Sequence, residues 1–197
     1  QLERQRAELE TLATRDPLTG LFNRREFVRL AEEELARARR NHSALSLLMI
    51  DLDHFKTIND KFGHPTGDDV LRNVAGLMER SVRQTDRVAR FGGEEFMLLL
   101  PDTSAADALH LANKLRQELA DTPIASIGAP VTASMGLACM PAGKTLALDT
   151  LLRQTDRALY QAKHMGRNRT VVAPLELETL ASAHHPSTTH KTNTPAP

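Results

Sequence analysis

Two adjacent glutamates, Glu94 and Glu95, follow two adjacent glycines, Gly92 and Gly93, in the stretch RFGGEEF. Neighbouring carboxylates in a tight bend repel each other unless a cation lies between them. Glycines in the bend tolerate positive φ and, because they have no Cβ, let a phosphate or a sugar approach the backbone. The stretch is typical of a β-hairpin that presents carboxylates to a metal-bound phosphate, although a solvated turn explains these residues alone equally well.

A second pair of carboxylates, Asp51 and Asp53, stands at the end of the largely apolar run from residue 44 to residue 50. Such a run suits a central strand that is buried on both faces. Mg²⁺ needs only one or two protein carboxylates and takes its remaining ligands from phosphate and water. We therefore expect Asp51 to be a metal ligand rather than a polar strand end, and Asp53 to be the N-cap of the next helix.

Groups that could bind phosphate flank these carboxylates. The backbone amides of His54 and Phe55 lie at the start of a predicted helix, where unpaired N–H groups attract anions. Lys56 adds a positive charge there, although alone it is typical of a surface lysine. Lys163 and Arg167 lie on either side of a predicted helix C-terminus, where interaction with the helix dipole explains them as well as a phosphate contact does.

Asn59 and Asp68 lie on either side of a turn that contains glycine. A carboxylate together with an amide can bind the N1–H and N2–H₂ donors and an acceptor on the edge of guanine, in the bidentate manner of base recognition. Each residue alone is explained by a turn or a helix cap.

Length and composition limit the classes of protein that remain. A chain of 197 residues suits one well-buried domain. Lys plus Arg equals Asp plus Glu at 25 each, which argues against a broad electrostatic footprint on nucleic acid or an anionic membrane. The single cysteine, Cys139, has no internal disulfide partner, and no apolar run approaches the length of a membrane span. We expect a cytoplasmic domain, and because the chain starts at Gln1, we expect it to be part of a longer protein that could be a membrane-bound receptor.

The chemistry-bearing residues must be positioned by alternating helices and strands. In the first half of the chain, the patterns predict a helix from Asp16–Pro17 to about residue 40, a strand over 44–51, a helix over 53–62 and a helix opened by Asp68. In the second half, they predict a hairpin around residues 92–93, a helix capped by Ser104, a strand over 131–140, a helix over 145–165 and a strand over 170–172. This order predicts an α+β domain with a central antiparallel or mixed sheet backed by helices, in the manner of ferredoxin-like folds. Residues 1–15 are interpreted as a signalling-helix or coiled-coil linker, 16–173 as the domain, and 174–197 as a disordered tail.

Several motifs in this order resemble the GGDEF domain of bacterial diguanylate cyclases, here in the GGEEF form. The similar segments are DPLTGLFNRR (16–25), DLDHFK (51–56), Asn59–Asp60, Gly63–His64, Gly67–Asp68, GGEEF (92–96), YQAK (160–163) and GRN (166–168). The resemblance covers about residues 15 to 173 and implies a palm-like nucleotidyl-cyclase fold. It also implies that two GTP molecules condense into cyclic di-GMP with release of pyrophosphate, in a homodimer whose two domains face each other.

The resemblance assigns roles residue by residue. It implies that Mg²⁺ or Mn²⁺ is bound by Asp51, the Leu52 carbonyl, Glu94 and Glu95, and that Glu94 also helps to deprotonate the attacking 3′-hydroxyl. It implies that Lys56 stabilises charge on the phosphates, which are bound by the His54 and Phe55 amides, Lys163 and Arg167. It also implies that the substrate approaches Gly92 and Gly93 and that Asn59, His64 and Asp68 line the nucleotide pocket. The alternative is an inactive module that binds GTP or cyclic di-GMP. Degenerate members of the family usually lose the Gly-Gly-Glu-Glu residues, which this chain keeps.

The segment RQTD (83–86) is similar to the family's RxxD inhibitory site for cyclic di-GMP, formed here by Arg83 and Asp86. Lys114 stands where the family often has a second arginine. A lysine cannot make the bidentate contact of an arginine, so we expect product inhibition to be weak. A solvated loop at a helix end is the alternative explanation of this short pattern.

Overall fold

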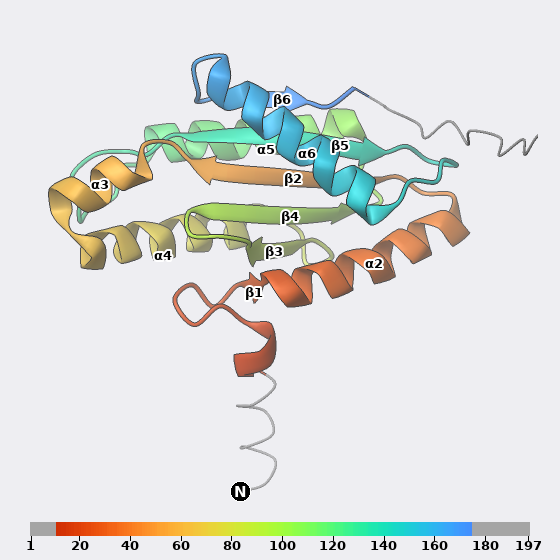
Figure 1. Ribbon diagram of the computed structural model, residues 1–197, viewed down its shortest axis with the longest axis horizontal. Helices are drawn as coiled ribbons and strands as arrows, with labels where there is room; N and C mark the ends of the chain where they lie inside the picture. The colour runs from red at the N-terminus through yellow and green to blue at the C-terminus, as the bar shows by residue number, and fades with distance from the viewer. Residues whose placement is uncertain (1–10, 175–197) are drawn as a thin grey trace, which may run out of the picture.

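The computed structural model describes residues 11–174 and centres on a six-stranded mixed sheet in the order β1-β3-β4-β2-β5-β6 (Figure 1). The strands are β1 (Phe22–Asn23), β2 (Leu45–Leu52), β3 (Arg87–Arg90), β4 (Glu95–Pro101), β5 (Ala133–Met140) and β6 (Thr170–Val172). The helices are α2 (Arg24–Asn41), α3 (Phe55–Phe62), α4 (His64–Ser81), α5 (Ala105–Asp121) and α6 (Leu148–His164). The predicted linker is described only from residue 11 and the predicted tail only at residue 174, and the rest of both lies outside the described residues. The α+β fold class is confirmed.

The central strand β2 is buried along its whole length, as its apolar sequence predicts. It pairs antiparallel with both β4 and β5, whereas the outer pairs β1–β3 and β5–β6 are parallel. Alternate residues of β2 enter different clusters: Leu48 and Ile50 pack into one core, and Leu45 and Leu47 into another. The sheet therefore separates two hydrophobic cores.

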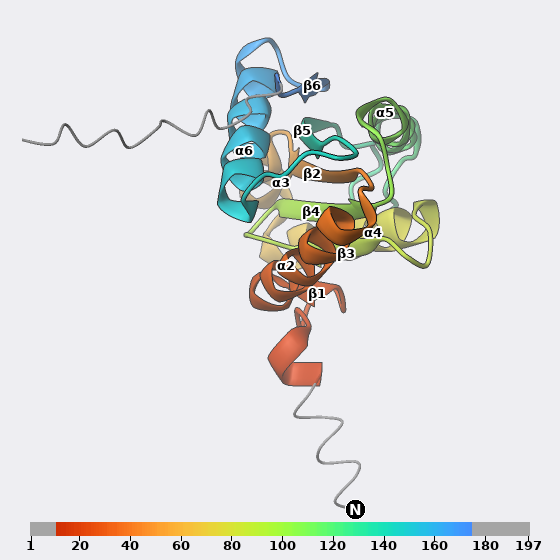
Figure 2. The ribbon, with the colours of Figure 1, turned by 90° about the vertical axis from the view of Figure 1, so that its right-hand side faces the viewer.

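Two helices cover each face of the sheet. Figure 2 shows α2 and α6 on one side of the strands and α4 and α5 on the other, while Figure 1 shows α3 at one end. The inward residues of α4 and α5, such as Val74 and Leu115, join the cluster that contains Ile50. Those of α2 and α6, such as Leu35 and Leu159, join the cluster that contains Leu47.

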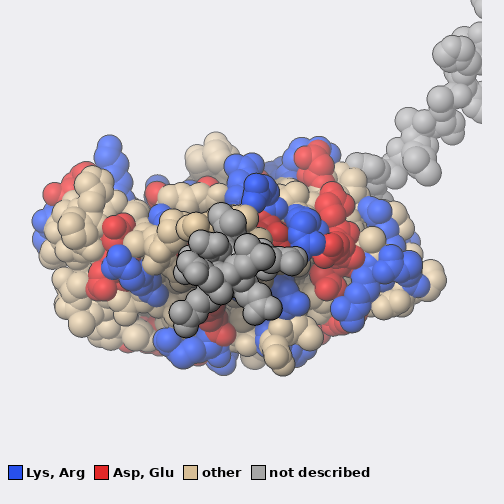
Figure 3. Space-filling view, turned by 90° about the horizontal axis from the view of Figure 1, so that it is seen from below, with Lys and Arg blue, Asp and Glu red and all other residues tan. Residues whose placement is uncertain are grey.

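The molecular surface agrees with the zero net charge of the sequence. Viewed from the side of β1, basic and acidic side chains lie in small interspersed groups (Figure 3). Within residues 11–174, none of the helices combines the length and the apolar character needed to cross a bilayer.

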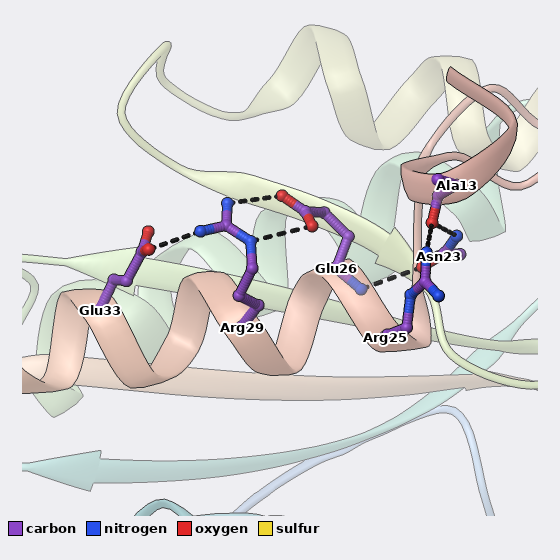
Figure 4. Close-up of polar contacts among 6 residues, drawn as sticks. All are labelled: Ala13, Asn23, Arg25, Glu26, Arg29 and Glu33. Carbon is purple, nitrogen blue, oxygen red and sulfur yellow. Dashed lines mark hydrogen bonds and ion pairs between the residues drawn. The ribbon is translucent and has the colours of Figure 1, made fainter. Parts of the chain in front are cut away.

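The first long helix starts later than its sequence predicts. Asp16 is not its N-cap: α2 begins at Arg24, and the cap is Asn23, whose side chain accepts a hydrogen bond from the Glu26 amide (Figure 4). Asp16 instead closes a turn by accepting hydrogen bonds from the amide and hydroxyl of Thr19. The prediction was wrong because an Asp–Pro pair favours a turn as readily as a helix start, and the short strand β1 was not predicted.

The region between β2 and β3 also differs from the prediction. Asp53 does not cap α3, because the N-cap residue is His54, which has a left-handed conformation and no side-chain cap bond. The helix α4 begins at His64, directly after Gly63 with φ of 86°, so that Asp68 lies within the helix instead of opening it. Pro65 in the first turn is a stronger start signal than Asp68, since its fixed φ suits that position.

The helix α6 packs directly on β5 at Gly136. A Cβ at this position would overlap the backbone carbonyl oxygen of Thr155 and the backbone nitrogen of Leu159. Both are backbone atoms of α6, so the helix could accommodate a side chain only by moving away from the sheet. The absence of a Cβ at Gly136 therefore sets the distance between α6 and the sheet.

We predict that Gly136→Ala lowers the free energy of unfolding by about 3 kcal/mol or more, because overpacking against backbone atoms cannot be relieved by a rotamer change. Urea unfolding followed by circular dichroism measures the effect. The matched control is Gly76→Ala in α4, where the new Cβ meets only the flexible end of Arg80. There we expect unchanged or slightly higher stability, since alanine favours a helix by about 1 kcal/mol over glycine. Equal losses in both variants would contradict the packing argument.

Candidate active site

Four segments meet at one end of the sheet, on the left in Figure 1: the carboxyl end of β2, the turn between β3 and β4, the start of α3 and the end of α6. They carry the residues that the sequence suggested for metal and phosphate binding. The hairpin is confirmed, because β3 and β4 pair antiparallel with Arg90 opposite Phe96. The turn between them spans residues 91–94.

Asp51 and Glu95 lie opposite each other on the neighbouring strands β2 and β4. Directly opposed residues of an antiparallel pair have Cβ atoms roughly 5 Å apart, close enough for their charges to interact. Burial raises the pKa of Glu95, and the negative charge of Asp51 raises it further. Burial is also the main cause that raises the pKa of Asp51, with a contribution from Asp53. This end of the sheet therefore holds carboxylates that are costly to ionise without a cation.

Lys163, at the end of α6, supplies a cation to this cluster. Its Nζ lies 2.7 Å from Oδ2 of Asp51, whose side chain is 9% exposed. The positive charges of Lys163 and Arg167 both lower the pKa of Asp51, against the larger effect of burial. The sequence suggested a helix-dipole or phosphate role for Lys163 and did not predict its pairing with Asp51.

The glycines of the hairpin turn do not use the positive φ that glycine tolerates, because neither Gly92 nor Gly93 has one. A Cβ on Gly92 would instead collide with Oε2 of Glu95, because the Glu95 side chain folds back over the turn, whereas Gly93 faces open space. Glu94 occupies the turn itself, its carbonyl accepting a hydrogen bond of 3.3 Å from the Leu52 amide, and its charge also raises the pKa of Glu95.

Arg90 holds the hairpin turn to the N-terminal part of the domain, a role that sequence reasoning missed. Its Nε and Nη2 donate to the carbonyl of Gly93 at 3.1 and 2.8 Å, and its Nη1 lies 3.3 Å from both carboxylate oxygens of Asp16. Burial opposes the ionisation of Asp16, but hydrogen bonds from Thr19 and the charge of Arg90 lower its pKa overall. The signal in the sequence was an arginine directly before the turn, but its partner lies 74 positions away.

The suggested guanine residues lie on α3 and α4, which pack against each other. Oδ1 of Asn59 is buried and has no hydrogen-bond partner among the described residues. It lies against Gly67, where any Cβ would overlap it. Asp68 follows Gly67 on α4 and is partly buried, while His64 at the start of α4 is exposed. A buried acceptor without a partner is costly, and a base could pair with this one after the Asn59 side chain turns away from Gly67.

The donor set fits a divalent cation that brings ligands of its own. Among residues 11–174 no three His, Cys, Asp or Glu side chains are grouped as a complete metal cage. Asp51 and Glu95 nevertheless face each other, and Asp51 already binds the ammonium group of Lys163. Two carboxylates suit Mg²⁺ when phosphate and water complete its octahedral shell.

The three residues of the suggested inhibitory site line one surface hollow of about 280 Å³, between the end of α4 and the start of α5. Arg83, Asp86 and Lys114 share it with His110, among others. Oδ2 of Asp86 accepts a hydrogen bond of 2.9 Å from the Arg83 amide, which fixes the loop. Lys114 pairs with Glu118 at 3.7 Å, and its side chain is 55% exposed. The hollow includes Leu100, at the opposite end of β4 from the hairpin turn.

Comparison with known proteins identifies what this arrangement is similar to. Residues 13–169 match the family described as "Diguanylate cyclase, GGDEF domain". The diguanylate cyclase DgcP of Pseudomonas aeruginosa is 44% identical over 163 residues, which cover 82% of this chain and 24% of DgcP. The response regulator PleD of Caulobacter vibrioides is 41% identical over 164 residues, covering 81% of this chain and 36% of PleD. The chain thus spans only about a quarter to a third of these relatives.

A solved structure has the same fold. The coiled coil and GGDEF domain of DgcB from Caulobacter crescentus, in complex with c-di-GMP, superimposes with a TM-score of 0.78 at 33% identity. The match covers 87% of this chain and 93% of that one.

We predict that Glu95→Gln raises the melting temperature at pH 7 by roughly 1–3 °C. In a chain of this size, that shift corresponds to a gain of up to about 1 kcal/mol in the free energy of unfolding. Because the pKa of Glu95 is raised in the folded protein, the folded state binds this proton more tightly than the unfolded chain does. Stability therefore falls as pH rises from the unfolded pKa, about 4.3, through the folded pKa. The glutamine variant should lack this part of the decline.

Differential scanning calorimetry between pH 4 and pH 8, without added metal, measures the difference. The control is Glu32→Gln, an exposed glutamate on α2, which should leave the profile unchanged. A Glu95→Gln variant that loses stability at neutral pH would show that the carboxylate is not a source of strain.

Proposed function

The chain belongs to the GGDEF-domain family of diguanylate cyclases, and on this basis we propose that it condenses two molecules of GTP into cyclic di-GMP. In each half of the reaction the 3′-hydroxyl of one GTP loses its proton and attacks the α-phosphorus of the other. A new P–O bond forms, and the bond to the β-phosphate breaks with release of pyrophosphate. Nucleotidyl transfer of this kind depends on in-line positioning and neutralisation of charge rather than on covalent catalysis.

The observation that carries the proposal is the pairing of Asp51 with Glu95 at the end of β2, next to Lys163. Carboxylates this close together repel each other when both are ionised, and the metal ion that accompanies a triphosphate would supply compensating positive charge. Asp51, Glu94, Glu95 and the carbonyl of Leu52 are proposed to hold Mg²⁺ or Mn²⁺. When bound, the metal neutralises phosphate charge and favours ionisation of the attacking hydroxyl.

Cationic and amide groups around the carboxylates are proposed to hold the triphosphate. The start of α3 presents the amides of His54 and Phe55, which lie among the first N–H groups of the helix and have no partner within it. The exposed Lys56 lies on the first turn of α3, and Lys163 and Arg167 approach from α6 and the loop that follows it. Because Gly92 and Gly93 have no side chains, the nucleotide is proposed to approach the backbone of the hairpin turn closely.

The unpaired acceptor of Asn59 supports guanine as the base. Guanine offers N1–H and N2–H₂ donors on one edge, which suit the Asn59 Oδ1 and the Asp68 carboxylate. Adenine has no donor at N1, so its binding would leave the buried Asn59 acceptor unpaired, at a cost of about 1–3 kcal/mol. His64 is proposed to line the same pocket.

One domain holds one GTP, so the product requires two domains facing each other across a two-fold axis. The N-terminal segment is suited to control that alignment. Asn23 Nδ2 and Arg25 Nη2 both donate to the carbonyl of Ala13, at 3.0 and 2.6 Å, which ties helical residues 11–14 to the start of α2 (Figure 4). Through this tie and the Asp16–Arg90 contact, an upstream module could transmit movement to the hairpin turn.

We predict that Glu94→Gln lowers the rate of cyclic di-GMP formation at least ~100-fold, because it removes a metal ligand and the group that assists deprotonation. The assay contains GTP, Mg²⁺ and concentrated protein, with chromatography of the products. EDTA should abolish the activity, and specific activity should rise with protein concentration, as a dimeric reaction requires. Glu32→Gln on the exposed face of α2 is the matched control and should retain full activity.

The outcomes separate catalysis from binding alone. If the wild-type protein binds GTP calorimetrically but yields no product at any concentration, the chain is a nucleotide-binding module and the cyclase proposal is wrong. If Glu94→Gln keeps the wild-type rate, the metal and base roles belong to another carboxylate.

A separate proposal concerns the hollow formed by Arg83, Asp86 and Lys114, which we propose binds cyclic di-GMP as an inhibitor. We predict that Lys114→Arg tightens this binding about fivefold to tenfold, because a guanidinium contacts a phosphate through two parallel hydrogen bonds whereas an ammonium acts as a point charge. Calorimetry with cyclic di-GMP measures the change. Lys144→Arg, at an exposed position outside the hollow, should have no effect. Binding that survives Arg83→Ala unchanged would place the inhibitor elsewhere.

A further inference from the structure

Asp53 is buried at the junction of three segments that are distant in sequence. Its Oδ1 accepts a hydrogen bond of 2.7 Å from the Ser134 hydroxyl, and its Oδ2 accepts one of 2.8 Å from the Thr132 hydroxyl. Oδ2 also accepts a bond of 3.0 Å from the backbone N–H of Asn168, 115 positions away. The residue is only 5% exposed. One carboxylate thus joins the end of β2 to the start of β5 and to the loop between α6 and β6.

The loop that Asp53 contacts has an unusual backbone. Gly166, Arg167 and Asn168 have φ of 107°, 58° and 43°, three consecutive left-handed values. Non-glycine residues reach this region at a cost of about 1–3 kcal/mol each, so they stay there only when surrounding contacts hold them. Two backbone hydrogen bonds hold the ends of the loop: the Arg167 N–H donates to the Ala162 carbonyl, and the Met135 N–H donates to the Arg169 carbonyl.

Two residues hold the middle of the loop at Asn168. Arg116 on α5 donates to the side-chain oxygen of Asn168 at 3.0 Å and to its backbone carbonyl at 3.5 Å, both in exposed contacts. Its backbone N–H is held by the buried carboxylate of Asp53. Both contacts involve a charged group, but solvent screens the exposed Arg116 contacts more than the contact of Asp53, whose side chain is only 5% exposed. Asp53 is therefore the main anchor for the left-handed conformation.

Arg167, the residue immediately before Asn168, belongs to the loop that directly follows α6, and Lys163 at the end of that helix contacts Asp51 at 2.7 Å. The loop therefore begins beside the carboxylate cluster at the end of β2. A contact that fixes the backbone of Asn168 therefore also fixes the position of the Arg167 Cα, from which the Arg167 side chain extends. A shift of about 1 Å in a group that contacts a reacting phosphate can cost on the order of 100-fold in rate.

We propose that Asp53 is a positioning residue for nucleotide binding: it locks the loop 166–168 so that Arg167 reaches the triphosphate, and it is not itself a metal ligand. The inference rests on the proposed function, since it deepens the role given there to Arg167. The hydrogen-bonding state of Asp53 supports it. A carboxylate offers about four acceptor sites, and three of those of Asp53 are already used by protein donors.

The test is a double-mutant cycle on nucleotide affinity. The ligand is a GTP analogue with a methylene group in place of the α,β-bridging oxygen, which binds but cannot release pyrophosphate. Calorimetry with Mn²⁺ should show that Asp53→Ala and Arg167→Ala each weaken binding about tenfold or more, the scale of a lost charge-assisted hydrogen bond. In the Arg167→Ala background, Asp53→Ala should change affinity by less than about twofold, because the two residues act as one unit.

Asp53→Asn separates the positioning role from metal ligation. The asparagine carbonyl can still accept from the Asn168 amide while its NH₂ group donates to the Ser134 hydroxyl, so binding should stay within about threefold of wild type. A metal ligand would lose its charge in both variants, so equal losses in Asp53→Asn and Asp53→Ala would overturn the inference. Thermal unfolding checks that each variant folds, and Asp53→Ser replaces Asp53→Ala in the cycle if the latter does not.

The remaining outcomes are distinct. If the wild-type protein does not bind the analogue, the proposed function fails and the inference fails with it. If binding is normal and Arg167→Ala weakens it, but the Asp53 effect is the same in both backgrounds, only the inference is overturned.

Discussion

The repulsion between the buried Asp51 and the partly buried Glu95 at the end of β2 is the constraint around which this protein is organised. Asp51 is brought opposite Glu95 by the register of the central strands, and burial raises the pKa of both. A folded chain tolerates such a cluster only when cations compensate for it. Lys163 supplies one of them from α6, at 2.7 Å from Asp51. The same imbalance makes the cluster receptive to a metal-bound triphosphate.

The elements around the cluster are positioned by close backbone packing. The lack of a Cβ at Gly136 lets α6 lie directly on β5, which brings Lys163 within reach of Asp51. The lack of a Cβ at Gly92 leaves room for the Glu95 side chain to fold over the hairpin turn. Gly67 likewise makes space for Asn59. Three glycines in different elements therefore control how closely functional side chains approach one another.

Two long-range polar contacts connect the cluster to the rest of the domain. Arg90 joins the hairpin turn to Asp16 at the start of the domain, and Asp53 joins the end of β2 to the loop that carries Arg167. Each links segments 74 or more positions apart. Both contacts use carboxylates, Asp16 and Asp53, that the local sequence predicts to be helix N-caps. Their partly buried, charge-assisted bonds give a rigid support to groups that must be held accurately.

The sequence by itself determined the α+β class, the buried central strand, the hairpin and the family. These features depend on apolar periodicity, glycine pairs and motifs, which are local properties of the chain. Its motifs also indicated which carboxylates and cations form the candidate site, because the family resemblance assigns them residue by residue; the strand order that brings them together was not predicted. The candidate site was thus predictable as a set of residues, although their ligand roles stay proposals.

Only the tertiary structure decided how those residues are used. Asp16 and Asp53 have the local signature of helix caps, yet each accepts hydrogen bonds from groups distant in sequence, and no local pattern encodes such a partner. The pairing of Lys163 with Asp51 likewise arises from packing of α6 on the sheet, and the fold of the Glu95 side chain over Gly92 arises from the geometry of the hairpin turn. Local propensity is a weak guide wherever a buried charge can gain more from a distant partner than from its own helix end.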